Sequence, residues 1–296
     1  MLDLGEAYMA TGRIAQAEDV LQQVLNRTSY CPDQAWAKMC YVDVCGELSM
    51  LYLAEGNFPS AQLMAERGVA YGEARGIDTL AAKTRLCLVY QYIGRWEDAL
   101  ALANKVFNTR ARDKRQGPTH HSTWKAEAEL AYIRARLGEV DAAERVFTDI
   151  AQKFENTLGK DHYDTLVART NLAWIYHVQH RFGEAELIQR EVLEKGRSVL
   201  GSDHAYTLYM MLRLGVTLGE SGKLQEAIDI LTKCQESRKE LLGELHPAWG
   251  AAAVWRTIFL WRRDGYDPTN DLSERDMEMF ELGKQYAEFP FTPVQI

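Results

Sequence analysis

Histidine is the side chain best suited to acid–base or metal chemistry near neutral pH, and three of the seven histidines recur at a fixed interval. Leu-Gly-x-x-His occurs at residues 158–162, 200–204 and 242–246, so His162, His204 and His246 are evenly spaced. A catalytic residue need not occur three times at one period, whereas a fixed period of this length indicates one supersecondary motif stacked repeatedly. We therefore expect these three histidines to be structural.

The other candidates for chemistry are weak. His120 and His121 are adjacent but have no Glu-x-x-His-type partner, so a metal site there is not indicated. Carboxylate pairs such as Glu184 and Glu186 belong to the repeat pattern and need no acid–base role. The chain has neither a Gly-x-Ser-x-Gly nucleophile motif nor a phosphate-binding loop. The sequence therefore predicts no catalytic constellation, no metal and no cofactor.

The charge balance bears on the kind of partner. The net charge is −8, whereas a nucleic-acid-binding protein normally carries a basic balance or a long basic stripe. The one dense basic run consists of Arg110, Arg112, Lys114 and Arg115, beside Gly117-Pro118. We interpret it as a solvated loop, with a docking patch for an acidic partner as the alternative. We expect no nucleic-acid partner.

The five cysteines have irregular spacing and no Cys-x-x-Cys pair, which indicates neither a disulfide framework nor a zinc site. Reduced thiols are typical of cytoplasmic or nuclear proteins, so we expect a cytoplasmic location. The sequence contains no apolar run long enough to cross a membrane, and its first residues lack the pattern of a signal peptide.

A second pattern runs through the whole chain: a small residue, a large residue three positions on, then Gly, then Ala. The small residue would allow the two helices of one repeat, A and B, to approach closely, and the large one would fill the space between repeats. The Gly can take a positive φ and close the turn between helices A and B. Examples are Cys87, Tyr90, Gly94 and Ala99; Gly215, Leu218, Gly222 and Ala227; and Ala173, Tyr176, His180 and Ala185, in which His180 takes the place of the Gly.

This pattern resembles the tetratricopeptide repeat. The longer period, with Leu-Gly-x-x-His between repeats, is similar to the kinesin-light-chain type found in fungal repeat proteins; residues 171–176 and 183–186 carry the resemblance most strongly. The resemblance implies an all-α fold, a right-handed superhelical solenoid of six to seven helix pairs, in which the A helices line the concave side. It also implies binding to other proteins rather than catalysis.

We expect the repeat array to span residues 1–270 and a C-terminal capping helix with a tail to occupy residues 271–296. Met1 falls halfway along the first A helix, which favours a truncated or shortened sequence. Between repeats, Gly159, Gly201 and Gly243 would end helix B in the left-handed conformation, and Asp161 and Asp203 would cap the next helix. Pro247 suits a first helical turn. Helices are predicted at about 2–10, 13–27, 33–54, 59–75, 78–93, 96–110, 122–136, 140–157, 162–178, 182–199, 204–220, 224–241, 247–262 and 273–287.

The expected ligand groove lies on the A helices, around the small position of each repeat. Asn171 matches an asparagine that in the resembling family clamps a peptide backbone, but Arg213 and Arg256 replace it in the next two repeats. Aromatic residues and Arg are enriched in interface hot spots, so we predict a peptide with an aromatic anchor flanked by Asp or Glu. The candidate groove residues are Tyr132, Asn171, Trp174, His177, Tyr209, Arg213, Trp255, Arg256 and Phe259.

Three functions follow from these observations. The first is a non-catalytic scaffold or adaptor that binds a peptide or partner protein in the groove. The second is an unusual enzyme with a small-molecule pocket in which His177 acts as acid or base; an enclosed pocket or a strongly shifted His177 pKa would favour it. The third is the sensor or oligomerisation arm of a larger signalling protein. The oligomeric state and the identity of the partner do not follow from the sequence.

Overall fold

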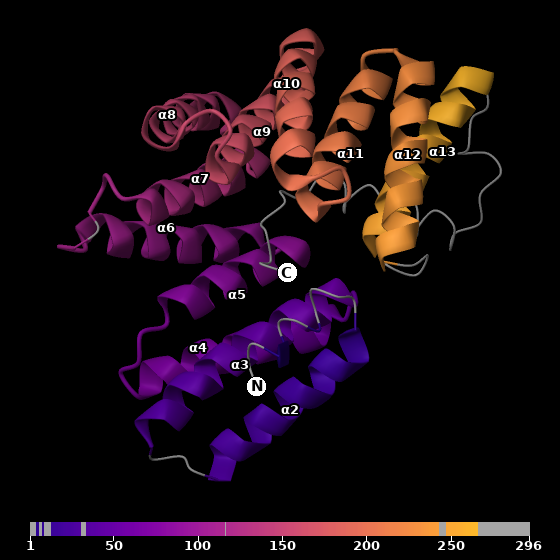
Figure 1. Ribbon diagram of the computed structural model, residues 1–296. Coiled ribbons are helices and arrows are strands. Elements are labelled where there is room, and N and C mark those ends of the chain that lie inside the picture. Colours follow the sequence, from indigo (N-terminus) through magenta and orange to yellow (C-terminus); the bar gives the residue numbers. More distant parts are fainter. Residues whose placement is uncertain are drawn as a thin grey trace. The chain divides into compact units, whose positions relative to one another are not determined.

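The described part of the chain is entirely α-helical (Figure 1). The computed structural model describes residues 13–30, 34–115, 117–242 and 247–265, together with Leu4, Gly5 and Tyr8. Twelve helices, α2 to α13, lie in these residues, and their predicted bounds agree with the observed ones to within three residues. The predicted capping helix at 273–287 lies outside the described residues. The helices are α2 (Ile14–Tyr30), α3 (Ala35–Ala54), α4 (Phe58–Ala74), α5 (Leu80–Tyr92), α6 (Trp96–Arg112), α7 (His121–Arg136), α8 (Val140–Leu158), α9 (Tyr163–Val178), α10 (Phe182–Leu200), α11 (Ala205–Glu220), α12 (Leu224–Leu242) and α13 (Pro247–Asp264).

The contacts divide the chain into two compact units. The boundary between them along the sequence falls within α7, between residues 133 and 134. In the first unit, each helix from α2 to α6 packs against the next; in the second, each helix from α8 to α13 does the same. The A helices also contact one another: α3 touches α5 in the first unit, and α11 touches both α9 and α13 in the second. The helices therefore pair in chain order, and the A helices of each unit share one face.

The small residue of the repeat permits close packing of its two helices, as predicted. A Cβ atom added at Gly215 of α11 would lie 2.7 Å from Cγ of Leu231 on α12. Gly5 has the same relationship to Leu21, whose Cδ2 atom would lie 2.8 Å from the added Cβ. At both positions a leucine side chain fills the space that the missing methyl group leaves, so the small residue sets the distance between helices A and B.

The turn between helices A and B requires a positive φ. Gly56, Gly94, Gly138 and Gly222 have φ angles between 74° and 101°, which confirms the predicted role of this glycine. His180 occupies the same position with a φ of 59° and is the one non-glycine residue with a positive φ among those described. The prediction that His180 substitutes for glycine is therefore confirmed, although an L-residue pays for this conformation with about 1–2 kcal/mol.

The cap between repeats is a histidine and not the predicted aspartate. Nδ1 of His162 accepts the backbone N–H of Asp164, at 3.1 Å, at the start of α9. Nδ1 of His204 accepts the backbone N–H of Tyr206 in the same way at the start of α11. The expectation for Asp161 and Asp203 was wrong by one residue, and Asp161 instead pairs with Lys195 of α10. His162 and His204 are thus structural, as predicted; His246 and Gly243 lie outside the described residues.

Glycine is needed at the end of helix B for a different reason from the one expected. Gly159 and Gly201 have positive φ angles of 89° and 95°, but their ψ angles of 166° and 157° are extended and not left-handed helical. This region of backbone space is essentially restricted to glycine. The freed carbonyl of Gly159 accepts a hydrogen bond from the hydroxyl of Thr165, at 2.8 Å. Pro247 begins α13, as predicted.

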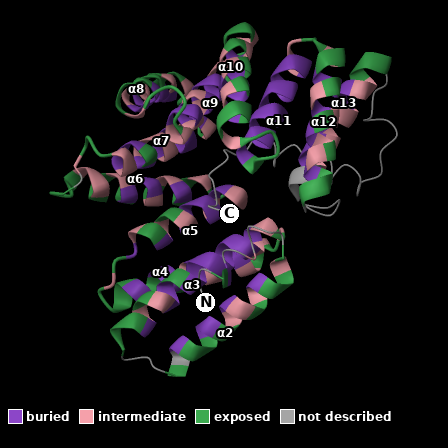
Figure 2. Cartoon of the chain, viewed as in Figure 1, coloured by how far each residue is buried: buried purple, intermediate pink, exposed green. Residues whose placement is uncertain are grey.

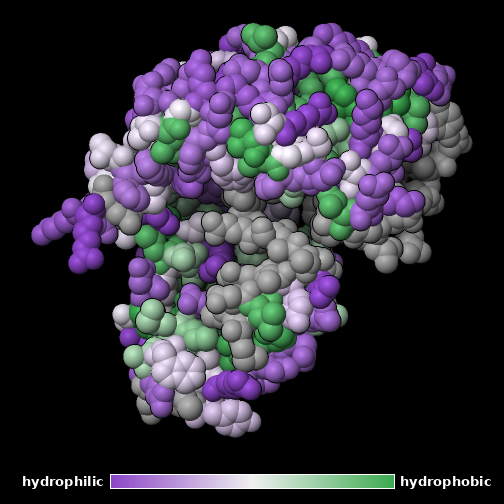
Figure 3. Space-filling model, in the orientation of Figure 1, coloured by the Kyte–Doolittle hydropathy of each residue, from purple (hydrophilic) through white to green (hydrophobic). Residues whose placement is uncertain are grey.

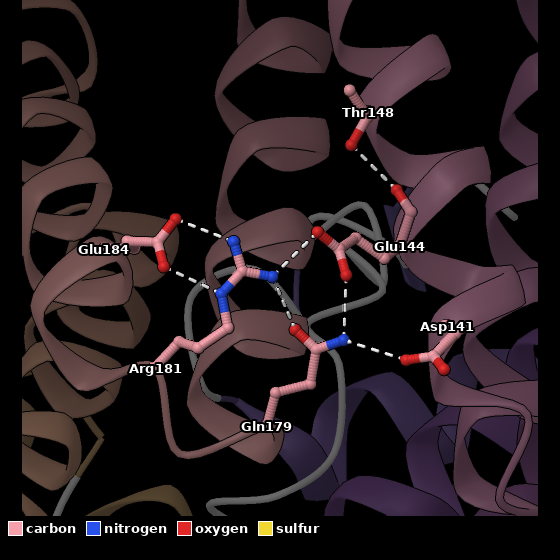
Figure 4. Close-up of polar contacts among 6 residues, drawn as sticks. All are labelled: Asp141, Glu144, Thr148, Gln179, Arg181 and Glu184. Atoms are coloured by element: carbon pink, nitrogen blue, oxygen red, sulfur yellow. Dashed lines mark hydrogen bonds and ion pairs between the residues drawn. The ribbon is translucent and has the colours of Figure 1, made fainter.

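In the second unit, ion pairs and hydrogen bonds connect successive repeats (Figure 4). The guanidinium of Arg181, in the turn before α10, pairs with Glu184 on its own helix and reaches back to Glu144 of α8. Gln179 donates to Glu144 as well, at 2.8 Å, and Arg181 lies over the ring of Tyr176. These contacts lower the pKa values of the Glu144 and Glu184 carboxyl groups. Tyr176, the large residue of the pattern, therefore contacts the Arg181 side chain that pairs with the preceding repeat.

The core of the second unit is thickest around α11. Every residue from Tyr206 to Gly219 of this helix is buried, whereas α10 and α12 keep an exposed stripe (Figure 2). The reason is that α11 packs against α9, α10, α12 and α13. None of the helices in the described ranges combines the length and the apolar character needed to cross a membrane.

Candidate functional site

The candidate site is the face of the second unit that α9, α11 and α13 share, and we call it the inner face. These three helices carry eight of the nine predicted groove residues: Asn171, Trp174, His177, Tyr209, Arg213, Trp255, Arg256 and Phe259. The ninth, Tyr132, lies on α7 in the first unit. Because α11 contacts both α9 and α13, side chains from three successive repeats lie next to one another here.

Burial divides these residues into two groups. The side chains of Asn171, His177 and Arg256 are half-buried, whereas the aromatic residues and Arg213 are buried. The rings of Trp255 and Phe259 are tilted against each other, with 5.6 Å between their centroids, and belong to the same hydrophobic cluster as Tyr209. Phe259 is fully buried against Gly219 of α11, so it is a core residue that positions α13. Among the eight residues of these helices, the three half-buried ones keep the most side-chain surface exposed.

His177 is held by a partner on the next A helix. Its Nδ1 lies 3.0 Å from the hydroxyl oxygen of Thr217 on α11. Burial, together with the positive charges of Arg213 and His180, lowers the pKa of His177 to about 3. The imidazole is therefore neutral at physiological pH and serves as a hydrogen-bonding group.

This pKa bears on the enzyme hypothesis. A strongly shifted His177 pKa was expected to favour that hypothesis, and the pKa is strongly shifted, but downward and away from neutrality. A general acid or base works best when its pKa is close to the operating pH. An imidazole with a pKa of about 3 is a weak base at pH 7 and carries no proton to donate as an imidazolium.

Asn171 and Arg256 lie on α9 and α13, the two A helices that contact α11. Asn171 lies on α9, one turn before the buried Trp174. Arg256 lies on α13, next to Trp255, and its buried Nε atom has no hydrogen-bond partner. An amide and a guanidinium supply both donors and acceptors, which suits recognition of a peptide backbone and of a carboxylate.

In the first unit, polar side chains connect successive A helices. Gln91 on α5 donates a hydrogen bond to Glu129 of α7, and Arg85 of α5 pairs with Glu47 of α3. Burial raises the pKa of Glu129, and the hydrogen bond from Gln91 partly offsets this. Tyr132 is buried nearby, with its ring 6.4 Å from that of Trp96. The sequence pattern gave no signal for Gln91, because it lies outside the positions that repeat.

His120 is a fourth copy of the capping histidine. Its Nδ1 accepts the backbone N–H of Ser122, at 3.2 Å, and the hydroxyl of Thr123 donates to the carbonyl of Gly117. Gly117 has a positive φ of 67°, like its counterparts Gly159 and Gly201. The pair Gly117 and His120 precedes Gly159 and His162 by one full period, so this role could have been read from the sequence. Among the described residues, no group of three potential ligands is placed to hold a metal ion.

Comparison with protein families identifies the chain. Models described as tetratricopeptide repeat match residues 1–23, 124–195 and 207–248. Together with the sequential packing of the helices, these matches define the class of the molecule: it is a tetratricopeptide repeat protein, whose described residues form twelve successive helices. No curated protein sequence matches the chain.

Solved structures share the fold. The chain is similar to the nearly identical TPR-like repeats of a kinesin-light-chain-type protein from Podosopora anserina, with 23% identity, a TM-score of 0.50 and coverage of 70% of this chain and 92% of that one. NprR bound to its cognate peptide NprX has 12% identity and a TM-score of 0.69, with 97% and 80% coverage. A Rap protein bound to the competence and sporulation factor has 12% identity and a TM-score of 0.68, with 92% and 71% coverage.

Proposed function

We propose that this protein is a non-catalytic scaffold that binds a peptide, or an extended segment of a partner protein, on the inner face of its second unit. The observation that supports the proposal is the contact of α11 with both α9 and α13, because a ligand that spans these helices could reach Asn171 and His177 of α9 and Arg256 of α13. A linear peptide touches several such side chains in succession. Two structures of similar fold support the proposal, since NprR is bound to its cognate peptide NprX and the Rap protein to the competence and sporulation factor.

The chemistry of the inner face favours a peptide with an aromatic anchor flanked by Asp or Glu. Trp174, Tyr209 and Trp255 are buried aromatic residues of the same three helices and would supply the apolar contact. Arg256 and Arg213 supply positive charge, and the neutral His177 adds none at pH 7. A cytoplasmic location is part of the proposal; the four described cysteines, Cys40, Cys45, Cys87 and Cys234, support it because all are free thiols.

The test is a selection from a random peptide library displayed on phage, followed by calorimetric measurement of the affinity of the selected peptides. We expect enrichment of sequences with an aromatic residue next to Asp or Glu. The double variant Asn171→Ala/Arg256→Ala should lose at least about tenfold in affinity, because it removes a hydrogen bond and a charged contact.

The matched control is Asn156→Ala/Arg197→Ala, which makes the same chemical changes on the B helices α8 and α10, where both side chains are exposed. Thermal unfolding of both variants shows whether each remains folded. Equal loss of affinity in the two variants, or no enriched peptide, would overturn the proposal. A peptide whose affinity is unchanged by the inner-face substitutions would bind elsewhere on the protein and would also contradict the proposal.

A further inference from the structure

The α6–α7 connection concentrates positive charge at one edge of the first unit. Arg112 ends α6, Asp113 caps it, and Lys114 and Arg115 form the turn that follows. Arg112, Lys114 and Arg115 are all exposed, and hydrophilic side chains gather where this connection projects at the left of Figure 3. Three cations thus lie within four residues of an acidic chain.

These three cations lie within one short connection and have no ion pair among the described residues, whereas many cations of the repeat helices do. Lys83, Arg95, Lys105, Arg181 and Arg190, for example, each pair with a carboxylate. Within the described residues, neither Arg112 nor Lys114 nor Arg115 takes part in an ion pair, and Arg115 uses only its backbone N–H, which donates to Asp113. Asp113 is the one carboxylate among residues 112–115, so this segment keeps an excess of two positive charges.

Helix electrostatics accounts for only part of this cluster. A cation in the last turn of a helix interacts favourably with the carbonyl groups there, which explains Arg112 and its neighbour Arg110. Arg110 is half-buried, and burial lowers the pKa of its guanidinium group. The negative charge of Asp78 partly offsets this effect. Lys114 and Arg115 lie beyond the end of the helix, where that interaction has faded. They remain exposed cations without a structural role.

We propose that Arg112, Lys114 and Arg115 form a docking site for a short acidic segment of a partner protein. Four consecutive residues span at most about 14 Å, which matches a few acidic side chains of a peptide. A long polyanion such as a nucleic acid, or an anionic membrane, would extend over the rest of a chain whose net charge is −8 and would be repelled there. This site lies in the first unit and does not depend on the inner face of the second.

The test measures the binding of a fluorescent oligoglutamate peptide by anisotropy at low and at physiological ionic strength. The wild-type protein should bind the peptide, and added salt should weaken the binding. The variant Arg112→Glu/Lys114→Glu/Arg115→Glu should bind it at least about tenfold more weakly, because three favourable exposed charge contacts become unfavourable.

The matched control is Arg145→Glu/Arg197→Glu/Lys233→Glu, which changes the net charge by the same amount on α8, α10 and α12, at exposed residues. It should bind the peptide with affinity close to that of the wild type. Equal weakening in both variants would show that only overall charge matters and would overturn the proposal, as would the absence of binding to the wild type. Tighter binding of an oligothymidylate, or of vesicles containing phosphatidylserine, would show that the partner class is wrong.

Discussion

Nδ1 of His162 accepts the backbone N–H of Asp164 at 3.1 Å, which makes an imidazole ring the N-cap of α9. Histidine is not among the strongly preferred N-cap residues, which are Ser, Thr, Asp and Asn. The same geometry at His120 and His204 shows that it belongs to the repeat. The recurrence of histidine therefore has a structural cause, namely the satisfaction of a free N–H group at the start of each A helix.

Replacement of His162 tests this cap. His162→Ala should lower the free energy of unfolding by about 1 kcal/mol, because the N–H of Asp164 loses its acceptor. His162→Asn should retain most of the stability, since its side-chain oxygen can accept the same N–H. Urea unfolding monitored by circular dichroism measures both values. Equal destabilisation by Ala and Asn would mean that the ring stabilises α9 through packing and not through its hydrogen bond.

Two glycines with equally close neighbours should respond differently to the same substitution. An added Cβ at Gly219 would lie 2.1 Å from Cζ of Phe259, and one at Gly196 would lie 2.1 Å from Cε of Met210. The ring of Phe259 is rigid and fully buried, whereas Met210 meets the new methyl with the flexible end of its side chain.

Gly219→Ala should therefore destabilise the protein by about 1–3 kcal/mol, which is the usual cost of overpacking a core. Gly196→Ala should be close to neutral, because a shift of Met210 and the higher helix propensity of Ala offset the clash. Thermal unfolding of the two single variants provides the comparison. If both variants lost the same stability, the rigidity of the neighbouring side chain would not be the deciding factor.

The positive φ of His180 predicts a stabilising substitution. His180→Gly should raise the free energy of unfolding by about 1 kcal/mol, since glycine adopts this conformation without steric cost. The imidazole also contacts the ring of Phe182, at 5.6 Å between centroids. His180→Ala separates the two effects, because it removes the ring but keeps the strained backbone. A gain in both variants would show that the ring, and not the backbone, carries the cost.

Gln189 of α10 is a buried polar residue without hydrogen bonds. Its side chain is 3% exposed, and neither Oε1 nor Nε2 has a partner. It follows Ala173 by the same interval at which Leu231 follows Gly215, so it occupies a position that packs helices A and B together. Gln189→Leu should stabilise the protein by about 1–3 kcal/mol, the cost of burying an unsatisfied polar group.

The control for this substitution is Gln152→Leu, which makes the same chemical change at an exposed position of α8. It should alter stability by no more than about 0.5 kcal/mol. Chemical unfolding of both variants gives the two differences. A loss of stability in Gln189→Leu would indicate that the amide has a role that the structure of the isolated chain does not account for.

The lowered pKa of His177 predicts a dependence of stability on pH. The unfolded chain binds a proton at His177 near pH 6.5, whereas the folded chain does so only near pH 3. Stability from this residue is therefore complete above pH 6.5 and is lost as the pH falls towards 3. Between pH 6.5 and pH 5.5 the loss should be about 1 kcal/mol.

His177→Gln removes the titrating group but keeps the capacity to bond Thr217. The difference in unfolding free energy between wild type and variant, measured at both pH values, isolates the contribution of His177 from that of the carboxylates. If the two proteins show the same pH dependence, His177 titrates normally and the inner face is more hydrated than the structure indicates.

Periodicity made much of the fold predictable. The small residue, the large residue and the glycine define helices and turns because each has one steric role that recurs, as at Gly215, Tyr176 and Gly222. The identity of the cap was not predictable in the same way. Asp161 and His162 are adjacent, both can accept an N–H, and only the path of the backbone decides which of them is in place.

The fourth copy of the inter-repeat motif was missed for a simpler reason. Gln116 stands where the other copies have leucine, so a motif that begins with Leu-Gly does not include Gly117 and His120. The inner face was harder still. Trp255 and Phe259 lie on the predicted helix, but a sequence pattern cannot tell whether an aromatic ring covers a neighbouring helix or faces a ligand, because both uses need the same residue types.

The extended, positive-φ glycine at the end of helix B has a consequence for how such proteins change length. Gly117, Gly159 and Gly201 each precede the next capping histidine by the same number of residues. Removal of residues 160–201 would join two junctions of matching sequence spacing, so the rejoined chain would meet the same type of loop. Recombination can therefore add or delete whole repeats while the loop between repeats keeps its conformation. The number of repeats is easier for evolution to alter than the chemistry of any single one.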